Sequence, residues 1–161
     1  HVARRAVAEP ELLVLMASGT HCPARRSALA TLLLLAAAPA RAEGPPTVVV
    51  IAHAGVRRLD VDTVQRLYTG RIVELAGQPV TVVNARSGSA VRDSFMATVL
   101  SQRDEDYRAY WTVRRHVGKG TPPRELDSAA EVIALVKSTP GAVGYVDSRD
   151  LVPGLNVVLR P

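Results

Sequence analysis

The segment 84–92, Asn-Ala-Arg-Ser-Gly-Ser-Ala-Val-Arg, carries the residue types best suited to binding chemistry. It follows a β-branched run typical of a strand and precedes an apolar periodicity typical of a helix. A helix N-terminus presents unpaired N–H groups and about half a positive charge, so it favours an anion. Gly88 lets the backbone approach a ligand closely, and Ser89 offers a hydroxyl. Arg86 or Arg92 could supply a charged fork for an oxyanion.

The same residues also permit a purely structural interpretation. Ser89 would then only cap the helix, and both arginines would be solvated surface residues. The spacing alone does not decide between the two interpretations. Leu67–Arg71 is a weaker candidate, typical of a helix that ends at a glycine and is followed by a surface arginine.

Motifs for catalysis or metal binding are missing from the sequence. Gly118–Pro123 is not a P-loop, because Gly120 interrupts the required order of residues. No Gly-x-Ser-x-Gly elbow occurs, and His53 and His116 lack metal-ligand spacing. We therefore expect no enzyme, no catalytic residues, no metal and no cofactor.

Strands and helices that could position the 84–92 segment alternate along the chain. Asp60 and Asp104 can each cap a helix, and Ser128 with Glu131 forms a capping-box pair before another. The pattern favours one α/β domain over residues 43–161. We expect four strands, at 47–52, 79–84, 142–146 and 155–159. We also expect four helices: 60–69, 89–101, one that begins at 104, and one that begins at 128 and ends before the Thr-Pro-Gly sequence at 139–141.

Residues 1–42 read as an export signal. Arg25 and Arg26 precede an apolar run of about 11 residues, and a small-x-small site follows at 40–42. The run is too short to span a membrane as a helix. We expect a signal peptide within 1–42 that is cleaved on export to the periplasm, by the Sec or the twin-arginine route. Met16 is a plausible true start, in which case residues 1–15 would not be part of the translated protein.

Composition excludes several other classes of protein. Aromatic residues make up 4% of the 161 residues, which disfavours stacking platforms for single-stranded nucleic acid. The single cysteine excludes an internal disulfide framework. Five of the 20 basic residues lie in 1–42, and the remainder is nearly balanced by acidic residues. A nucleic-acid-binding surface is therefore not expected, nor is a membrane span after signal cleavage.

Three segments, in order, resemble the substrate-binding protein of the bacterial phosphate ABC transporter. Residues 67–72, Leu-Tyr-Thr-Gly-Arg-Ile, resemble the family's Ile-Phe-x-Gly-Lys-Ile segment. Residues 88–95, Gly-Ser-Ala-Val-Arg-Asp-Ser-Phe, resemble its Gly-Ser-Gly-Thr-Arg-Asp-x-Phe anion loop. Residues 139–146, Thr-Pro-Gly-Ala-Val-Gly-Tyr-Val, resemble its Pro-Gly-x-Ile-Gly-Tyr-Val strand. The match runs over most of 47–148.

The resemblance implies one lobe of a type 2 periplasmic-binding-protein fold, with a central mixed sheet flanked by helices. It also implies a non-enzymatic, periplasmic protein that binds inorganic phosphate or a similar oxyanion. An ABC transporter permease and a second copy of the chain are the candidate partners. The implied ligand-binding residues are Arg86, Ser87, Gly88, Ser89, Ala90, Val91 and Arg92, with Ser89 and the backbone of Ala90 and Val91 facing the anion.

This sequence departs from the family pattern in two ways. Ala90 and Val91 replace a glycine and a threonine, so one hydroxyl donor is lost. The family's first lobe, which supplies further phosphate contacts, has no counterpart. Two hypotheses therefore remain. The first is a periplasmic anion-binding module that binds weakly or is completed by a partner or by self-association. The second is a secreted structural or protein-interaction module without a ligand of its own.

Overall fold

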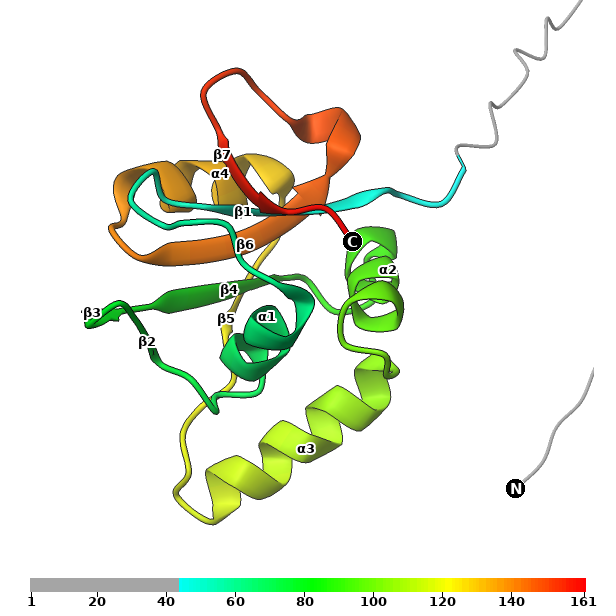
Figure 1. Ribbon diagram of the computed structural model, residues 1–161. Helices are drawn as coiled ribbons and strands as arrows, with labels where there is room; N and C mark the ends of the chain where they lie inside the picture. Colours follow the sequence, from blue (N-terminus) through cyan, green and yellow to red (C-terminus); the bar gives the residue numbers. More distant parts are fainter. Residues whose placement is uncertain (1–43) are drawn as a thin grey trace, which may run out of the picture. The chain divides into compact units, whose positions relative to one another are not determined.

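A five-stranded mixed sheet organises the part of the chain that the computed structural model describes, residues 44–161 (Figure 1). The expected signal peptide lies outside these residues and stays a prediction. The strand order is β5-β4-β6-β1-β7. The strands are β1 (Val48–Ala52), β4 (Thr81–Ala85), β5 (Arg124–Leu126), β6 (Ala142–Asp147) and β7 (Asn156–Leu159).

The sheet combines parallel and antiparallel pairs. Strand β4 runs parallel to both of its neighbours, β5 and β6, while β1 is antiparallel to β6 and β7. The central strands β1 and β6 are buried along their whole length, as their β-branched runs predict. The expected central mixed sheet flanked by helices is confirmed.

Helices cover both faces of the sheet (Figure 1). The helices α1 (Val61–Tyr68), α2 (Ala90–Thr98) and α3 (Asp104–His116) lie on one side, and α4 (Ala129–Ser138) packs on the other. The two cores divide the side chains of β1, with Val50 facing the three-helix side and Ile51 facing α4. Such alternation is expected of a strand covered on both faces.

Aromatic packing fixes α2, the helix that follows the 84–92 segment, against the sheet. The Phe95 ring stacks on the Tyr145 ring of β6, with centroids 3.9 Å apart. The ring centroid of Tyr68, at the end of α1, lies 4.6 Å from that of Phe95. All three side chains are almost fully buried, so the start of α2 has a defined place relative to β4 and β6.

At two of the four described α-helices, the predicted N-cap residue makes a side-chain hydrogen bond to the first turn. The Asp60 carboxylate accepts a hydrogen bond from the Thr63 N–H (2.6 Å), and the Ser128 hydroxyl accepts one from the Glu131 N–H (3.2 Å), as predicted. The predicted cap at Asp104 is wrong in position, because Arg103 occupies the N-cap and makes no side-chain cap bond. Asp104 is instead the first residue of α3, and its carboxylate pairs with Arg92.

Two short features were not anticipated. Strand β5 follows the 118–123 loop and pairs with β4. A two-stranded hairpin, β2 (Glu74–Leu75) with β3 (Gln78–Pro79), precedes β4. None of the helices within 44–161 is long and apolar enough to cross a membrane.

Candidate functional site

The 84–92 segment lies at the carboxyl edge of the parallel strands. Strand β4 leads into it, and its neighbours β5 and β6 end at Leu126 and Asp147. The Arg86 N–H donates to the Leu126 carbonyl (3.0 Å), which fixes the start of the loop to β5. In α/β sheets this edge is where ligands usually bind. The topology therefore places the predicted segment at the expected edge.

The turn into α2 depends on Gly88 and Ser89. Gly88 has φ +78°, a left-handed conformation that disfavours a side chain, while no neighbouring atom would obstruct a Cβ. Ser89 occupies the N-cap, but its side chain makes no cap bond to the helix. Its hydroxyl donates instead to the Arg86 carbonyl (2.7 Å). The simple helix-capping role considered for Ser89 is therefore wrong.

The first N–H groups of α2 are left without acceptors. Residues Ala90 and Val91 open the helix, so their N–H groups have no intrahelical partner. No other group between residues 44 and 161 accepts a hydrogen bond from either of them. Ala90 is exposed and Val91 is half-buried, so this end of α2 is open to a small ligand.

Arg92 lies beneath the loop, with its side chain 1% exposed. Its Nε is 2.6 Å from Asp104 Oδ1, and one terminal nitrogen is 2.6 Å from Glu125 Oε1. The same nitrogen donates to the Ala85 carbonyl (2.8 Å). Burial opposes the charge, but hydrogen bonds to the two carboxylates outweigh it and raise the pKa of Arg92. Its guanidinium is thus occupied within the protein.

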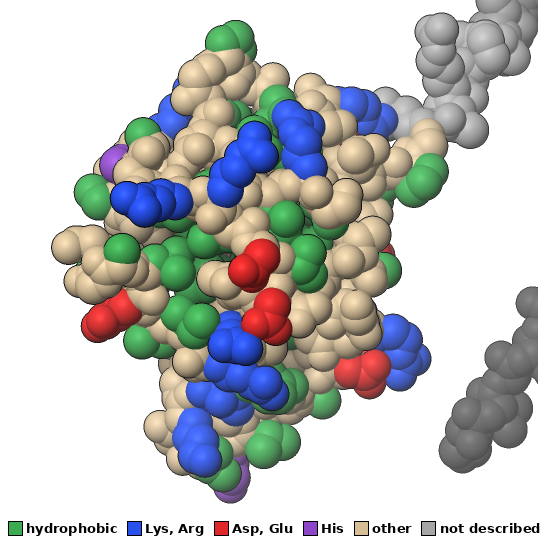
Figure 2. Space-filling view, viewed as in Figure 1, with side chains coloured by type: hydrophobic (Ala, Val, Ile, Leu, Met, Phe, Trp, Pro, Cys, Tyr) green, Lys and Arg blue, Asp and Glu red, His purple; other side chains and the backbone are tan. Residues whose placement is uncertain are grey.

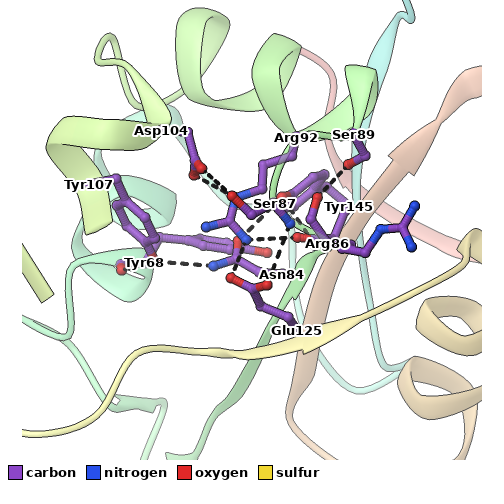
Figure 3. A network of polar contacts seen from close by, with 11 residues as sticks. Tyr68, Asn84, Arg86, Ser87, Ser89, Arg92, Asp104, Tyr107, Glu125 and Tyr145 are labelled. Atoms are coloured by element: carbon purple, nitrogen blue, oxygen red, sulfur yellow. Dashed lines mark hydrogen bonds and ion pairs between the residues drawn. The ribbon is translucent and has the colours of Figure 1, made fainter. Parts of the chain in front are cut away.

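The two carboxylates also hold Ser87. The Ser87 hydroxyl donates to Asp104 Oδ2 (2.5 Å), and its N–H donates to Glu125 Oε2 (3.4 Å). Figure 3 shows Asp104 and Glu125 on either side of the Arg92 guanidinium. We call Ser87, Arg92, Asp104 and Glu125 the loop clamp. It ties α2, α3 and β5 to one loop and so pre-organises the start of α2.

Arg86 differs from Arg92 in its surroundings. Its side chain is exposed and points away from the loop clamp in Figure 3. It makes no ion pair with any residue of 44–161. Of the two predicted arginines, Arg86 is therefore the one available to an anion, and Arg92 supports the loop from below.

Carboxylates surround the other side of Ser89. A small cavity of about 60 Å³ there is bordered by Asp127, Asp147 and Asp150. Asp147 is paired with Arg149 (2.6 Å), whose hydrogen bond lowers the pKa of the Asp147 carboxyl. The local potential is therefore mixed rather than strongly positive.

Buried tyrosines and Asn84 support the loop from the sheet side. The Tyr145 hydroxyl accepts from the Ala85 N–H (3.2 Å) and donates to Asn84 Oδ1 (3.3 Å). Asn84 Nδ2 donates to the Tyr107 hydroxyl (3.3 Å), which donates to the Tyr68 carbonyl (2.9 Å). Burial raises the pKa of all three phenols, that of Tyr107 to about 12. These groups act as neutral hydrogen-bonding partners.

Sequence reasoning missed Asp104 and Glu125 as parts of this site. Asp104 stood out only as a helix start, and Glu125 lies in a strand that the pattern did not predict. Neither is close to the loop in sequence, so no local spacing could have found them. Within 44–161, no group of His, Cys, Asp and Glu side chains could hold a metal ion.

Comparison with known proteins relates this fold to solved structures. No protein-family model and no curated protein sequence matches the chain. A structure named as a phosphate ABC transporter substrate-binding protein with bound phosphate, from Clostridium perfringens, matches with TM-score 0.56 and 21% identity. An ABC-type phosphate transport receptor from Vibrio cholerae matches with TM-score 0.55 and 17% identity, and PstS from Borrelia burgdorferi with 0.52 and 16%.

The match covers one part of those longer proteins. It includes 70% of this chain but 44%, 45% and 46% of the three structures, in the same order. The chain thus spans less than half the length of each. At this level of identity the comparison shows the fold, which is that of one lobe of a periplasmic-binding-protein-like structure.

Proposed function

We propose that this chain is a non-enzymatic, periplasmic binding protein that holds inorganic phosphate or a similar oxyanion at the start of α2. The observation that carries the proposal is the pair of N–H groups, on Ala90 and Val91, that have no acceptor within 44–161. They lie beside an unpaired Arg86, in a fold shared with phosphate-binding proteins. Unpaired amides and a nearby guanidinium are suitable donors for an oxyanion.

Each predicted residue has a distinct part in this proposal. The amides of Ala90 and Val91 donate to the anion, and the Ser89 hydroxyl joins them by rotating away from the Arg86 carbonyl. Arg86 adds charge from the loop, and Gly88 permits the turn. Ser87 and Arg92 act from beneath, because their polar groups are held within the loop clamp.

The proposed site is one-sided. An anion at the start of α2 would remain open to water, where charged hydrogen bonds are weak. The matched structures contain more than twice the length of the matched part, and a second lobe would be the natural cover. We therefore propose that a second copy of this chain or an ABC transporter permease completes the site. The expected affinity of the chain alone is modest.

Carboxylates near Ser89 favour a second candidate function. Asp127 and Asp150 border the small cavity beside the loop and would repel a dianion. This observation fits an exported structural or protein-interaction module with no ligand of its own. Phosphate binding distinguishes the two candidates directly.

Isothermal titration of the purified protein with phosphate, and with sulfate for comparison, tests the proposal. We expect saturable phosphate binding that weakens about tenfold in Ser89→Ala, because a charge-assisted hydrogen bond is lost. Ser138→Ala is the matched control, since the Ser138 hydroxyl also donates to a carbonyl three residues earlier but lies at the end of α4. Absence of binding at millimolar phosphate would favour the interaction module.

A further inference from the structure

A second polar hollow lies on α3, away from the start of α2. Its volume is about 200 Å³. In Figure 2, Lys and Arg side chains lie over both the upper and the lower part of the molecule, and Figure 1 places α1 and α3 in the lower part. The side chains that line the hollow come mainly from α3 and from the strands beneath it, and they include Arg92, Tyr107, Arg108, Trp111, Arg115 and Glu125.

Two arginines of the hollow have no acidic partner. Arg108 and Arg115 are exposed, and neither forms an ion pair with any described residue. Other arginines of this region are engaged. Arg103 pairs with Asp106 (3.2 Å), and Arg114 donates to the Lys119 carbonyl (2.8 Å). Among the three arginines that line the hollow, only Arg92 therefore has an acidic partner within residues 44–161.

The indole of Trp111 lines the hollow between the two arginines. Trp111 is 5% exposed, and its Nε1 is buried without a hydrogen-bond acceptor in the described structure. It lies near the Tyr107 hydroxyl, another residue of the hollow, but without hydrogen-bond geometry. The Trp111 ring therefore forms part of the wall of the hollow, while its N–H is shielded from solvent.

The charge balance of the hollow is positive. Glu125 is its only acidic lining residue, and its carboxylate is already bound to Arg92 (2.6 Å). Arg108 and Arg115 remain as uncompensated charges. They are seven positions apart in the sequence, which is about two turns and about 10 Å along the helix axis. That separation suits a ligand with two negative groups rather than one.

We propose that this hollow binds a small anion with two negative groups, a dicarboxylate or a diphosphate. Arg108 and Arg115 each take one negative group, and the ring of Trp111, which lies between them on α3, forms the wall of the site. The site is separate from the start of α2, because none of Ser89, Ala90 and Val91 lines it. It therefore does not depend on the proposed phosphate site.

The single tryptophan of the chain provides a local reporter for this site. We would titrate the full protein with succinate and, separately, with pyrophosphate, and follow tryptophan fluorescence. Sodium chloride at matched ionic strength serves as the reference. We expect a saturable change with at least one of the two probes, and the comparison between them distinguishes a carboxylate site from a phosphate site.

Variants connect that signal to the proposed residues. Arg108→Gln and Arg115→Gln should each weaken binding about tenfold, because each removes a charge-assisted contact. Arg58→Gln changes the net charge equally but lies outside the hollow, and it should bind like the unmodified protein. Ser89→Ala should also leave this signal unchanged, which separates it from the phosphate proposal. A response matched by sodium chloride, or unaltered in both α3 variants, would overturn the inference, as would no response to either probe.

Discussion

The Arg92 guanidinium lies 2.6 Å from the Asp104 carboxylate, in a pair that joins α2 to α3 beneath an exposed loop. Arg92 is 1% exposed and Asp104 is 13% exposed. The pair is therefore buried, and a buried charge without a partner is costly. Because Asp104 also accepts from the Ser87 hydroxyl, the same pair determines the shape of the loop that leads into α2.

Replacement of Arg92 should reveal this structural role. Arg92→Met leaves two carboxylates without their shared partner, and we expect a loss of about 3 kcal/mol in the free energy of unfolding. Urea denaturation measures it. The control is Arg103→Met, which removes an exposed pair with Asp106 and should cost much less than the loss of Arg92. Equal losses in the two variants would contradict the loop clamp.

Two serines at helix N-caps should differ in their effect on stability. The Ser128 hydroxyl accepts from the Glu131 N–H, so Ser128→Ala should cost about 1 kcal/mol. Ser89 makes no such bond, and Ser89→Ala should change the free energy of unfolding by less than about 0.5 kcal/mol. Chemical denaturation of both variants measures the difference. A cost for Ser89→Ala as large as that for Ser128→Ala would show that Ser89 caps α2 after all.

These serines also show what the sequence could predict and where it failed. Asp60, Ser128 and the buried strand at 47–52 depend on neighbours within a few residues, and the local pattern predicted them. Ser89 also precedes a helix, but it lacks the glutamate three residues later that Ser128 has, and its hydroxyl turns back to the Arg86 carbonyl. That choice depends on a loop whose conformation is set by α3 and β5, which are distant in sequence.

The candidate site also contains residues that the sequence could predict and residues that it could not. The segment from Arg86 to Val91 could be predicted, because a strand, a glycine and a helix start follow one another in sequence. The burial of Arg92 could not, since its partners Asp104 and Glu125 lie 12 and 33 residues away. Only the pairing of β4 with β5 brings Glu125 to the loop.

Stability should fall at alkaline pH because of the buried phenols. Burial raises the pKa of Tyr107 to about 12 in the folded state, against about 10 when unfolded. The folded protein therefore holds this proton more tightly, so its contribution to stability is complete below about pH 10 and decreases as pH rises toward 12. Urea denaturation at about pH 9 and about pH 11 measures the fall. The free energy of unfolding of Tyr107→Phe should fall less steeply between these two pH values. An equal fall in the variant and the unmodified protein would contradict this assignment.

Close packing of β6 against α4 makes Gly144 intolerant of a side chain. A Cβ at Gly144 would lie 2.7 Å from Val132 Cγ1 and 2.9 Å from Val83 Cγ2. We expect Gly144→Ala to cost about 1–3 kcal/mol through overpacking. Gly55→Ala is the control, because its Cβ would meet only His53 Nδ1 at an ordinary 3.8 Å. Thermal unfolding of both variants measures the effect, and equal midpoints would contradict the packing described for β6.

The amide resonances of Ala90 and Val91 provide the most direct test of the proposed oxyanion site. We would record ¹H–¹⁵N correlation spectra of the protein during a phosphate titration. We expect saturable shifts concentrated at Ala90 and Val91, with little change at Ala130, which lies in the first turn of α4. Shifts of equal size at both helix starts, or none at Ala90 and Val91 at millimolar phosphate, would contradict it.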